Sequence, residues 1–156
     1  MKKIALLVVV LAVAIAGLAV AQGKVDFSGK WAPKVDPNAA PPAGGGGGGG
    51  RGGMGGGPMT VKQTPAELTQ EVVRGENTVT TVFKLDGTES VNAQGQGQAK
   101  STAKWDGAKL VIKTVAEGPN GATETTATWS LSADGKELTI LRVTARGERS
   151  TVYTKQ

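Results

Sequence analysis

The sequence lacks cysteine and histidine altogether. The absence of cysteine excludes disulfides and thiolate chemistry, and the absence of histidine excludes Ser-His and Cys-His nucleophile pairs and the usual zinc ligands. The acidic residues stand mostly at turns or at alternating polar positions, and no loop shows the D-x-D-x-D-G calcium pattern. We therefore expect neither an enzyme nor a bound metal or cofactor.

A basic cluster and a helical hydrophobic pattern are also missing. The net charge is +5, and Lys2 and Lys3 supply two of these charges. The remaining basic residues are scattered and not interleaved with aromatics, so we expect no nucleic-acid partner. After residue 21, no window keeps apolar residues at i, i+3, i+4 and i+7, so the pattern predicts no helix there.

Residues 1–21 have the pattern of a secretory signal peptide. Lys2 and Lys3 precede an apolar run over residues 4–20, and Ala19-Val20-Ala21 offers the small-x-small site of a signal peptidase. The alternative is an uncleaved membrane anchor, because the run approaches the spanning length of about 20 residues. We favour cleavage, which predicts a secreted or periplasmic protein whose single domain is residues 22–156.

Residues 33–58 form a low-complexity segment rich in glycine and proline, with twelve glycines between Gly44 and Gly57. Glycine loses much entropy on ordering and offers no side chain to bury. The segment therefore predicts a disordered loop after the first strand. It lacks the strand–loop–helix setting and the Lys-Ser/Thr end of a phosphate-binding loop.

The rest of the chain is rich in short alternating segments separated by turn signals. Four dipeptides, Asp86-Gly87, Asp106-Gly107, Asn120-Gly121 and Asp134-Gly135, predict two-residue hairpins in which both central residues have positive φ. The strands are expected at 25–32, 59–64, 67–74, 77–85, 88–92, 99–105, 109–116, 123–131, 138–145 and 148–155, and residues 93–98 should loop out. Sequential hairpins favour an all-β fold, an antiparallel up-and-down β-barrel of about 8–10 strands.

The faces predicted to point inward carry small and hydroxyl-bearing side chains among larger apolar ones. They include Thr81, Phe83, Ser101, Ala103, Trp105, Leu110, Ile112, Thr125, Ala127, Trp129 and Thr151. A filled core prefers larger apolar side chains, so this mixture indicates a cavity. A register shift of one residue would instead turn these side chains toward solvent, and both interpretations stay open at this point.

Several motifs resemble the calycins, the superfamily of lipocalins and fatty-acid-binding proteins. Phe27-Ser28-Gly29-Lys30-Trp31 resembles their F-x-G-x-W opening. Later segments follow the fatty-acid-binding-protein order, namely Val82-Phe83-Lys84-Leu85, Lys100-Ser101, Asp106-Gly107-Ala108-Lys109-Leu110-Val111, Glu124-Thr125-Thr126, Asp134-Gly135-Lys136 and Tyr153-Thr154-Lys155. The resemblance covers roughly residues 77–155 and the first strand. It implies a barrel that binds a small hydrophobic ligand.

The resemblance also suggests which residues bind the ligand. The family holds a carboxylate with two inward arginines and a tyrosine, the last two as Arg-x-Tyr. Here Tyr153 remains, Thr151 occupies one arginine position and Trp129 the other. Either Arg149 or Arg142 would then replace the missing arginines, or the ligand carries no carboxylate. Phe83 would line the cavity. The pair of lid helices is replaced by the Gly/Pro-rich segment.

We therefore expect an extracytoplasmic barrel that binds a lipid or fatty-acid-like molecule. The membrane would be contacted only through an uncleaved signal segment. The alternative is a structural or protein-interaction module with a filled core, which the missing arginine pair favours. A barrel used as the scaffold of an enzyme or an enzyme inhibitor is the weakest of the three hypotheses.

Overall fold

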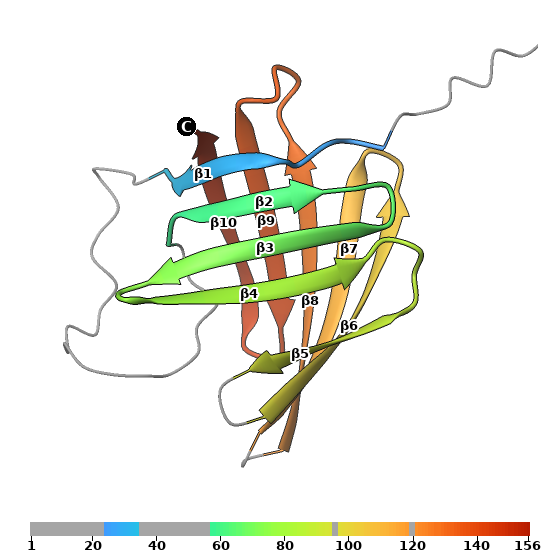
Figure 1. Ribbon diagram of the computed structural model, residues 1–156. Coiled ribbons are helices and arrows are strands. Elements are labelled where there is room, and N and C mark those ends of the chain that lie inside the picture. Colours follow the sequence, from blue (N-terminus) through green and yellow to red (C-terminus); the bar gives the residue numbers. More distant parts are fainter. Residues whose placement is uncertain (1–23, 35–56, 95–96, 119–120) are drawn as a thin grey trace, which may run out of the picture.

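The computed structural model describes residues 24–34, 57–94, 97–118 and 121–156. This part of the chain forms ten β-strands (Figure 1). They are β1 (Gly29–Pro33), β2 (Met59–Gln63), β3 (Glu67–Arg74), β4 (Asn77–Lys84), β5 (Glu89–Gln94), β6 (Gly97–Asp106), β7 (Lys109–Gly118), β8 (Gly121–Leu131), β9 (Glu137–Thr144) and β10 (Gly147–Lys155). The predicted signal peptide and nearly all of the Gly/Pro-rich segment lie outside the described residues.

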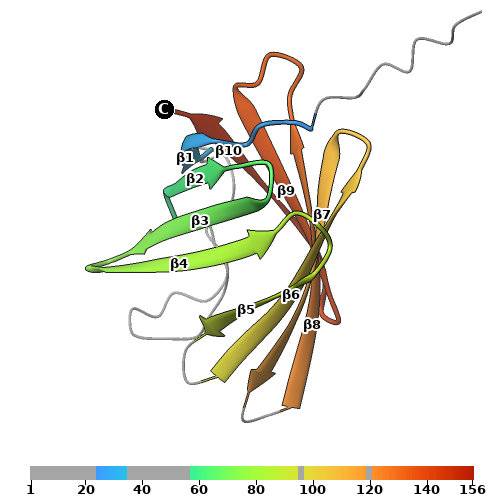
Figure 2. The ribbon, with the colours of Figure 1, turned by 45° about the vertical axis from the view of Figure 1, so that its right-hand side comes forward.

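All ten strands belong to one antiparallel sheet in the order β4-β3-β2-β1-β10-β9-β8-β7-β6-β5. The edge strands of this sheet are β4 and β5. Because the first strand pairs with the last, the sheet curls round and brings these two edges toward each other. Figures 1 and 2 show β1–β4 crossing over the long strands β6–β10. The prediction of an all-β, nearly closed up-and-down barrel is confirmed, and no helix occurs in the described ranges.

The hydrophobic core fills one end of the barrel. Phe27 is fully buried there, with its ring stacked 5.9 Å from the ring of Trp105 and edge-on at 5.8 Å to that of Trp129. The other large buried side chains are Trp31, Val61, Leu68, Leu110, Ile112, Leu138 and Ile140. Trp31 is thus a core residue, and the aromatic cluster of Phe27, Trp105 and Trp129 closes this end.

The first strand is shorter than the predicted range of 25–32. The segment before it is held by side-chain hydrogen bonds between residues 25–28 and Gln63, and not by the backbone pairing of a strand. The Gln63 carboxamide accepts a hydrogen bond from the Phe27 amide and donates one to the Val25 carbonyl, while the Ser28 hydroxyl accepts one from the Gln63 amide. The Trp31 indole donates to the Phe27 carbonyl. The segment is therefore fixed in place without extending the strand.

The turns also differ from the prediction that both residues of each Asp-Gly pair would have positive φ. No non-glycine residue in the described ranges has a positive φ, so the aspartates of the Asp-Gly pairs do not adopt that conformation. Asp106 instead ends β6 and pairs with Lys109, which leaves Gly107 and Ala108 as the turn. At Asp86, the carboxylate accepts hydrogen bonds from the amide and hydroxyl of Thr88, and these bonds lower the Asp86 pKa.

The loop predicted over residues 93–98 is also shorter than expected. Strand β5 continues to Gln94 and β6 begins at Gly97, with Gln94 and Gly97 paired directly. A Cβ at Gly97 would collide with the backbone carbonyl of Glu117 on β7. The glycine that suggested a loop therefore serves a close backbone approach inside the sheet.

Side chains of β5 close the seam between the two sheet edges. The Asn92 carboxamide accepts a hydrogen bond from the Val82 amide at 2.8 Å and donates one to the Val82 carbonyl at 2.9 Å. The Ser90 hydroxyl accepts a third from the Lys84 amide at 2.8 Å. These contacts take the place of backbone pairing between β4 and β5, and they protect edges that would otherwise be free to pair with another chain.

We expect Asn92→Ala to weaken the barrel, because it leaves two half-buried backbone groups of Val82 without partners. The free energy of unfolding should fall by about 1–3 kcal/mol, as measured by urea denaturation. Asn77→Ala is the matched control, since Asn77 is exposed in the β3–β4 hairpin. Equal stability of the two variants would show that the carboxamide bridge does not hold the seam.

Candidate ligand-binding cavity

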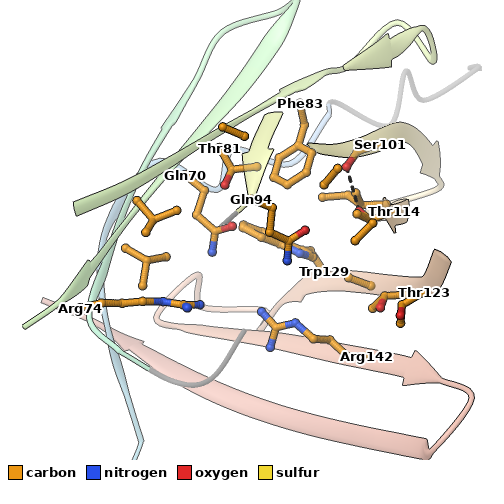
Figure 3. Close-up of a pocket in the computed structure, with 18 of the residues that line it drawn as sticks. Gln70, Arg74, Thr81, Phe83, Gln94, Ser101, Thr114, Thr123, Trp129 and Arg142 are labelled. Atoms are coloured by element: carbon orange, nitrogen blue, oxygen red, sulfur yellow. Dashed lines mark hydrogen bonds between the residues drawn. The ribbon is translucent and has the colours of Figure 1, made fainter. Parts of the chain in front are cut away.

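The barrel encloses a cavity of about 540 Å³ next to the aromatic cluster (Figure 3). This volume falls within the range of small-molecule sites, about 300–1,000 Å³. The lining comes from β3 to β10 and includes Gln70, Val72, Arg74, Val79, Thr81, Phe83, Gln94, Ser101, Ile112, Thr114, Glu117, Thr123, Thr125, Ala127, Trp129, Arg142 and Tyr153. The interaction-module alternative required a filled core. A barrel with a cavity of this size does not have one.

The inner face of β6–β9 changes character along the barrel. Cross-strand partners at the closed end are bulky, as in the series Trp105, Leu110, Trp129 and Ile140. The next series consists of Ala103, Ile112, Ala127 and Arg142, and the one after it of Ser101, Thr114, Thr125 and Thr144. Smaller side chains leave space beyond the aromatic cluster, so this gradient creates the cavity.

Arg142 brings a positive charge into this space from β9. It lies opposite Ala127 on β8 and opposite Arg149 on β10. Its Nε atom is buried and has no hydrogen-bond partner within the described structure. A buried guanidinium donor without an acceptor is costly, so this atom marks a place where an external acceptor would be stabilised.

Further polar groups converge with Arg142 on the middle of the cavity. In Figure 3 the side chains of Gln70, Gln94 and Arg74 approach it from β3 and β5. The Gln94 Oε1 atom is buried and, among the described residues, unpartnered, whereas Gln70 donates to the Met59 sulfur at 3.1 Å. The arrangement offers donors and acceptors beside a mainly apolar wall, which suits an amphiphilic molecule.

The structure brings together four of the six residues predicted for the site. Phe83, Trp129, Arg142 and Tyr153 all line the cavity, and Tyr153 is 2% exposed. Their roles in binding remain predictions. Trp129 is a core residue whose ring is nearly perpendicular to that of Phe27, and it also forms part of the cavity wall.

The other two predicted residues, Thr151 and Arg149, do not line the cavity. Thr151 stands at the arginine position of the Arg-x-Tyr motif, and it is half-buried opposite Ile140. Because threonine is uncharged, this position supplies no charge. Arg149 is exposed near the start of β10, about 14 Å along the strand from Tyr153. It therefore does not lie beside the tyrosine, and Arg142 is the arginine that faces the space.

Sequence reasoning did not single out Gln70, Arg74, Gln94 or Thr114 as site residues. The alternation along β3 places Gln70, Val72 and Arg74 on one face, and this signal was available. What the alternation does not reveal is that β3 crosses over β9. That crossing brings Arg74 and Gln70 toward Arg142 (Figure 3).

Acidic side chains are scattered over the described ranges. No group of three or more could hold a metal ion there. Among the residues that the structure describes, Glu117 is the one acidic residue in the cavity wall. The described part of the chain contains no helix that is long and apolar enough to cross a membrane.

Together these features define a calycin-like barrel with an internal cavity. No protein-family profile matches the chain, and no curated protein matches it. Solved structures do match. Caenorhabditis elegans lipid binding protein 8, in its apo form, is 11% identical with a TM-score of 0.60, and the match covers 83% of this chain and 95% of that one.

Two further solved structures have the same architecture. A protein described as the REP1-NXSQ fatty acid transporter is 13% identical with a TM-score of 0.59, covering 83% of this chain and 96% of its own. Secretory abundant heat soluble protein 4 from Ramazzottius varieornatus is 17% identical with a TM-score of 0.57, covering 83% and 94%. The resemblance to calycins is thereby confirmed for the fold.

Proposed function

We propose that this protein binds an amphiphilic molecule with an acidic head and an apolar body, of the fatty-acid class, inside the barrel. The observation that carries the proposal is the buried Nε atom of Arg142, which has no hydrogen-bond partner among the described residues and belongs to the lining of a cavity of about 540 Å³. A carboxylate would give this guanidinium a charge-assisted hydrogen bond.

The walls of the cavity support the same ligand class. Phe83, Ile112 and Trp129 provide apolar surface beside the polar centre. Burial of an alkyl chain against such surface contributes roughly 25 cal/mol per Å² removed from water. The names of two structural neighbours, a lipid binding protein and a fatty acid transporter, agree with this class of ligand.

Displacement of a fluorescent apolar probe from the purified protein tests the proposal. Fatty acids should displace the probe saturably and with one site per chain, and alcohols of equal chain length should displace it less well. The reason is that only the acid carries a negative charge, which can form a charge-assisted hydrogen bond with the Arg142 guanidinium. A folded protein that binds neither the probe nor any acid would contradict the proposal.

We further propose that the protein acts outside the cytoplasm. The support is the charged, apolar and small-x-small series of residues 1–21. Mass spectrometry of protein recovered from an exporting cell should find an N-terminus at Gln22. A chain that retains Met1 would favour the membrane-anchor alternative.

A further inference from the structure

Three hydroxyl side chains form a row across the cavity wall. Ser101 on β6 is the cross-strand partner of Thr114 on β7, and Thr114 is the partner of Thr125 on β8. All three line the cavity. Ser101 is 3% exposed and Thr114 is 7% exposed, so two of these hydroxyls are deeply buried.

The buried pair retains one hydrogen-bond donor that it cannot use internally. The Ser101 and Thr114 oxygens lie 2.8 Å apart, and either hydroxyl can be the donor (Figure 3). Two hydroxyls carry two protons, and one hydrogen bond between them uses only one. Among the described residues neither hydroxyl has a second partner, so the remaining proton is available to an acceptor in the cavity.

Apolar residues flank the pair along both strands. Ala103 and Ile112 precede it on the side of the aromatic cluster, and Ala99 and Ala116 follow on the other side. A wall of alkyl groups alone would suit a plain hydrocarbon chain, and an unsatisfied hydroxyl proton in such a wall costs free energy. The pair is therefore a polar position with alkyl groups on both sides of it along β6 and β7.

This position is separate from the acidic-head site at Arg142. Thr114 lies two strands away from Arg142, which is roughly 10 Å across the sheet. In Figure 3 the Arg142 guanidinium points toward Arg74 and away from the hydroxyl pair. One small ligand that spans the cavity would meet both positions, with different parts of its structure.

We propose that the ligand carries a second oxygen, a hydroxyl or ketone within its apolar chain, which accepts a hydrogen bond from the Ser101–Thr114 pair. This rests on the proposed function and narrows the ligand class to oxygenated fatty acids. A site built to hydrogen-bond a ligand oxygen discriminates against the analogue that lacks it, because the buried protein group is then left unpaired.

The test compares an unsubstituted eighteen-carbon acid with its isomers that carry one hydroxyl or one ketone at successive positions. Affinities for the wild-type protein are measured by probe displacement and by calorimetry. We expect at least one oxygenated isomer to bind about tenfold more tightly than the parent acid. The preferred position reports the distance between the acidic-head site and the hydroxyl pair.

The double variant Ser101→Ala, Thr114→Val removes both hydroxyls with little change in volume. It should reduce the preference for the best isomer to within about twofold, because the parent acid then leaves no buried hydroxyl unpaired and binds more tightly than to the wild-type protein. Thr126→Val is the control, because Thr126 lies on the opposite face of β8 from Thr125. This control should keep the full preference.

The outcomes separate the inference from the proposed function. If acids bind but every oxygenated isomer binds no more tightly than its parent, the inference is wrong and the proposed function stands. If the double variant loses affinity for the parent acid, the pair holds the acidic head and the inference is likewise overturned. If no acid of either kind binds, both fail. The wild-type series decides the inference even if the double variant does not fold.

Discussion

Arg142→Leu is expected to reduce the affinity for a fatty acid by about 10- to 100-fold, and to leave the affinity for the alcohol of equal chain length nearly unchanged. The substitution removes a buried donor that has no partner within the described chain, so the loss should equal the charge-assisted hydrogen bond to the ligand, about 1.5–3 kcal/mol. Probe displacement by acid and alcohol in parallel measures both affinities.

Arg149→Leu is the matched control for this experiment. Arg149 lies opposite Arg142 on the neighbouring strand and its loss changes the net charge equally, but the residue is exposed and does not line the cavity. The affinity of the Arg149→Leu variant for the acid should stay within about threefold of wild type, because the charge of an exposed side chain is screened by solvent. Equal losses in the two variants would mean that only the overall positive charge attracts the acid.

Phe27→Ala is expected to lower the free energy of unfolding by about 3–5 kcal/mol. Phe27 is fully buried, and its ring contacts the rings of Trp105 and Trp129. The substitution leaves a void at the closed end of the barrel, where the surrounding strands are held in the sheet and cannot collapse around it. Urea denaturation followed by far-ultraviolet circular dichroism measures the loss.

Val73→Ala controls for the general effect of truncating an apolar side chain. Val73 is 51% exposed on the outer surface of β3, so its truncation should change stability by less than about 0.5 kcal/mol. A loss below about 1 kcal/mol for Phe27→Ala would show that the segment before β1 is not part of the core. Because a less stable barrel can also bind more weakly, ligand affinities of this variant should be measured well below its unfolding midpoint.

The strands were the most predictable part of this protein. From β3 to β10, the expected ranges agree with the observed bounds to within a few residues, because alternation with period two is a local property of the chain. The same alternation placed Phe83, Ser101, Thr125 and Trp129 on the inner face, and these residues do line the cavity.

The local geometry of the turns was less predictable. Asp-Gly pairs were expected to form the turns themselves, yet Asp106 belongs to β6, and the Asp86 side chain accepts hydrogen bonds from Thr88. The dipeptide signal marks the place where the chain reverses. It does not determine which two residues occupy the turn, because side-chain hydrogen bonds and the register of the flanking strands decide that.

The sequence by itself thus determined the strands, their sequential antiparallel order and the two alternating faces of most strands, but not which of the two faces points inward. Only the tertiary structure decided which inward residues meet. Pairing of β1 with β10 curls the sheet so that Gln70 and Arg74 on β3 approach Arg142 on β9, and so that Asn92 bridges to β4. Alternation fixes the face of a side chain, whereas the curl and crossing of the strands fix its neighbours across the barrel, and these depend on the whole sheet at once.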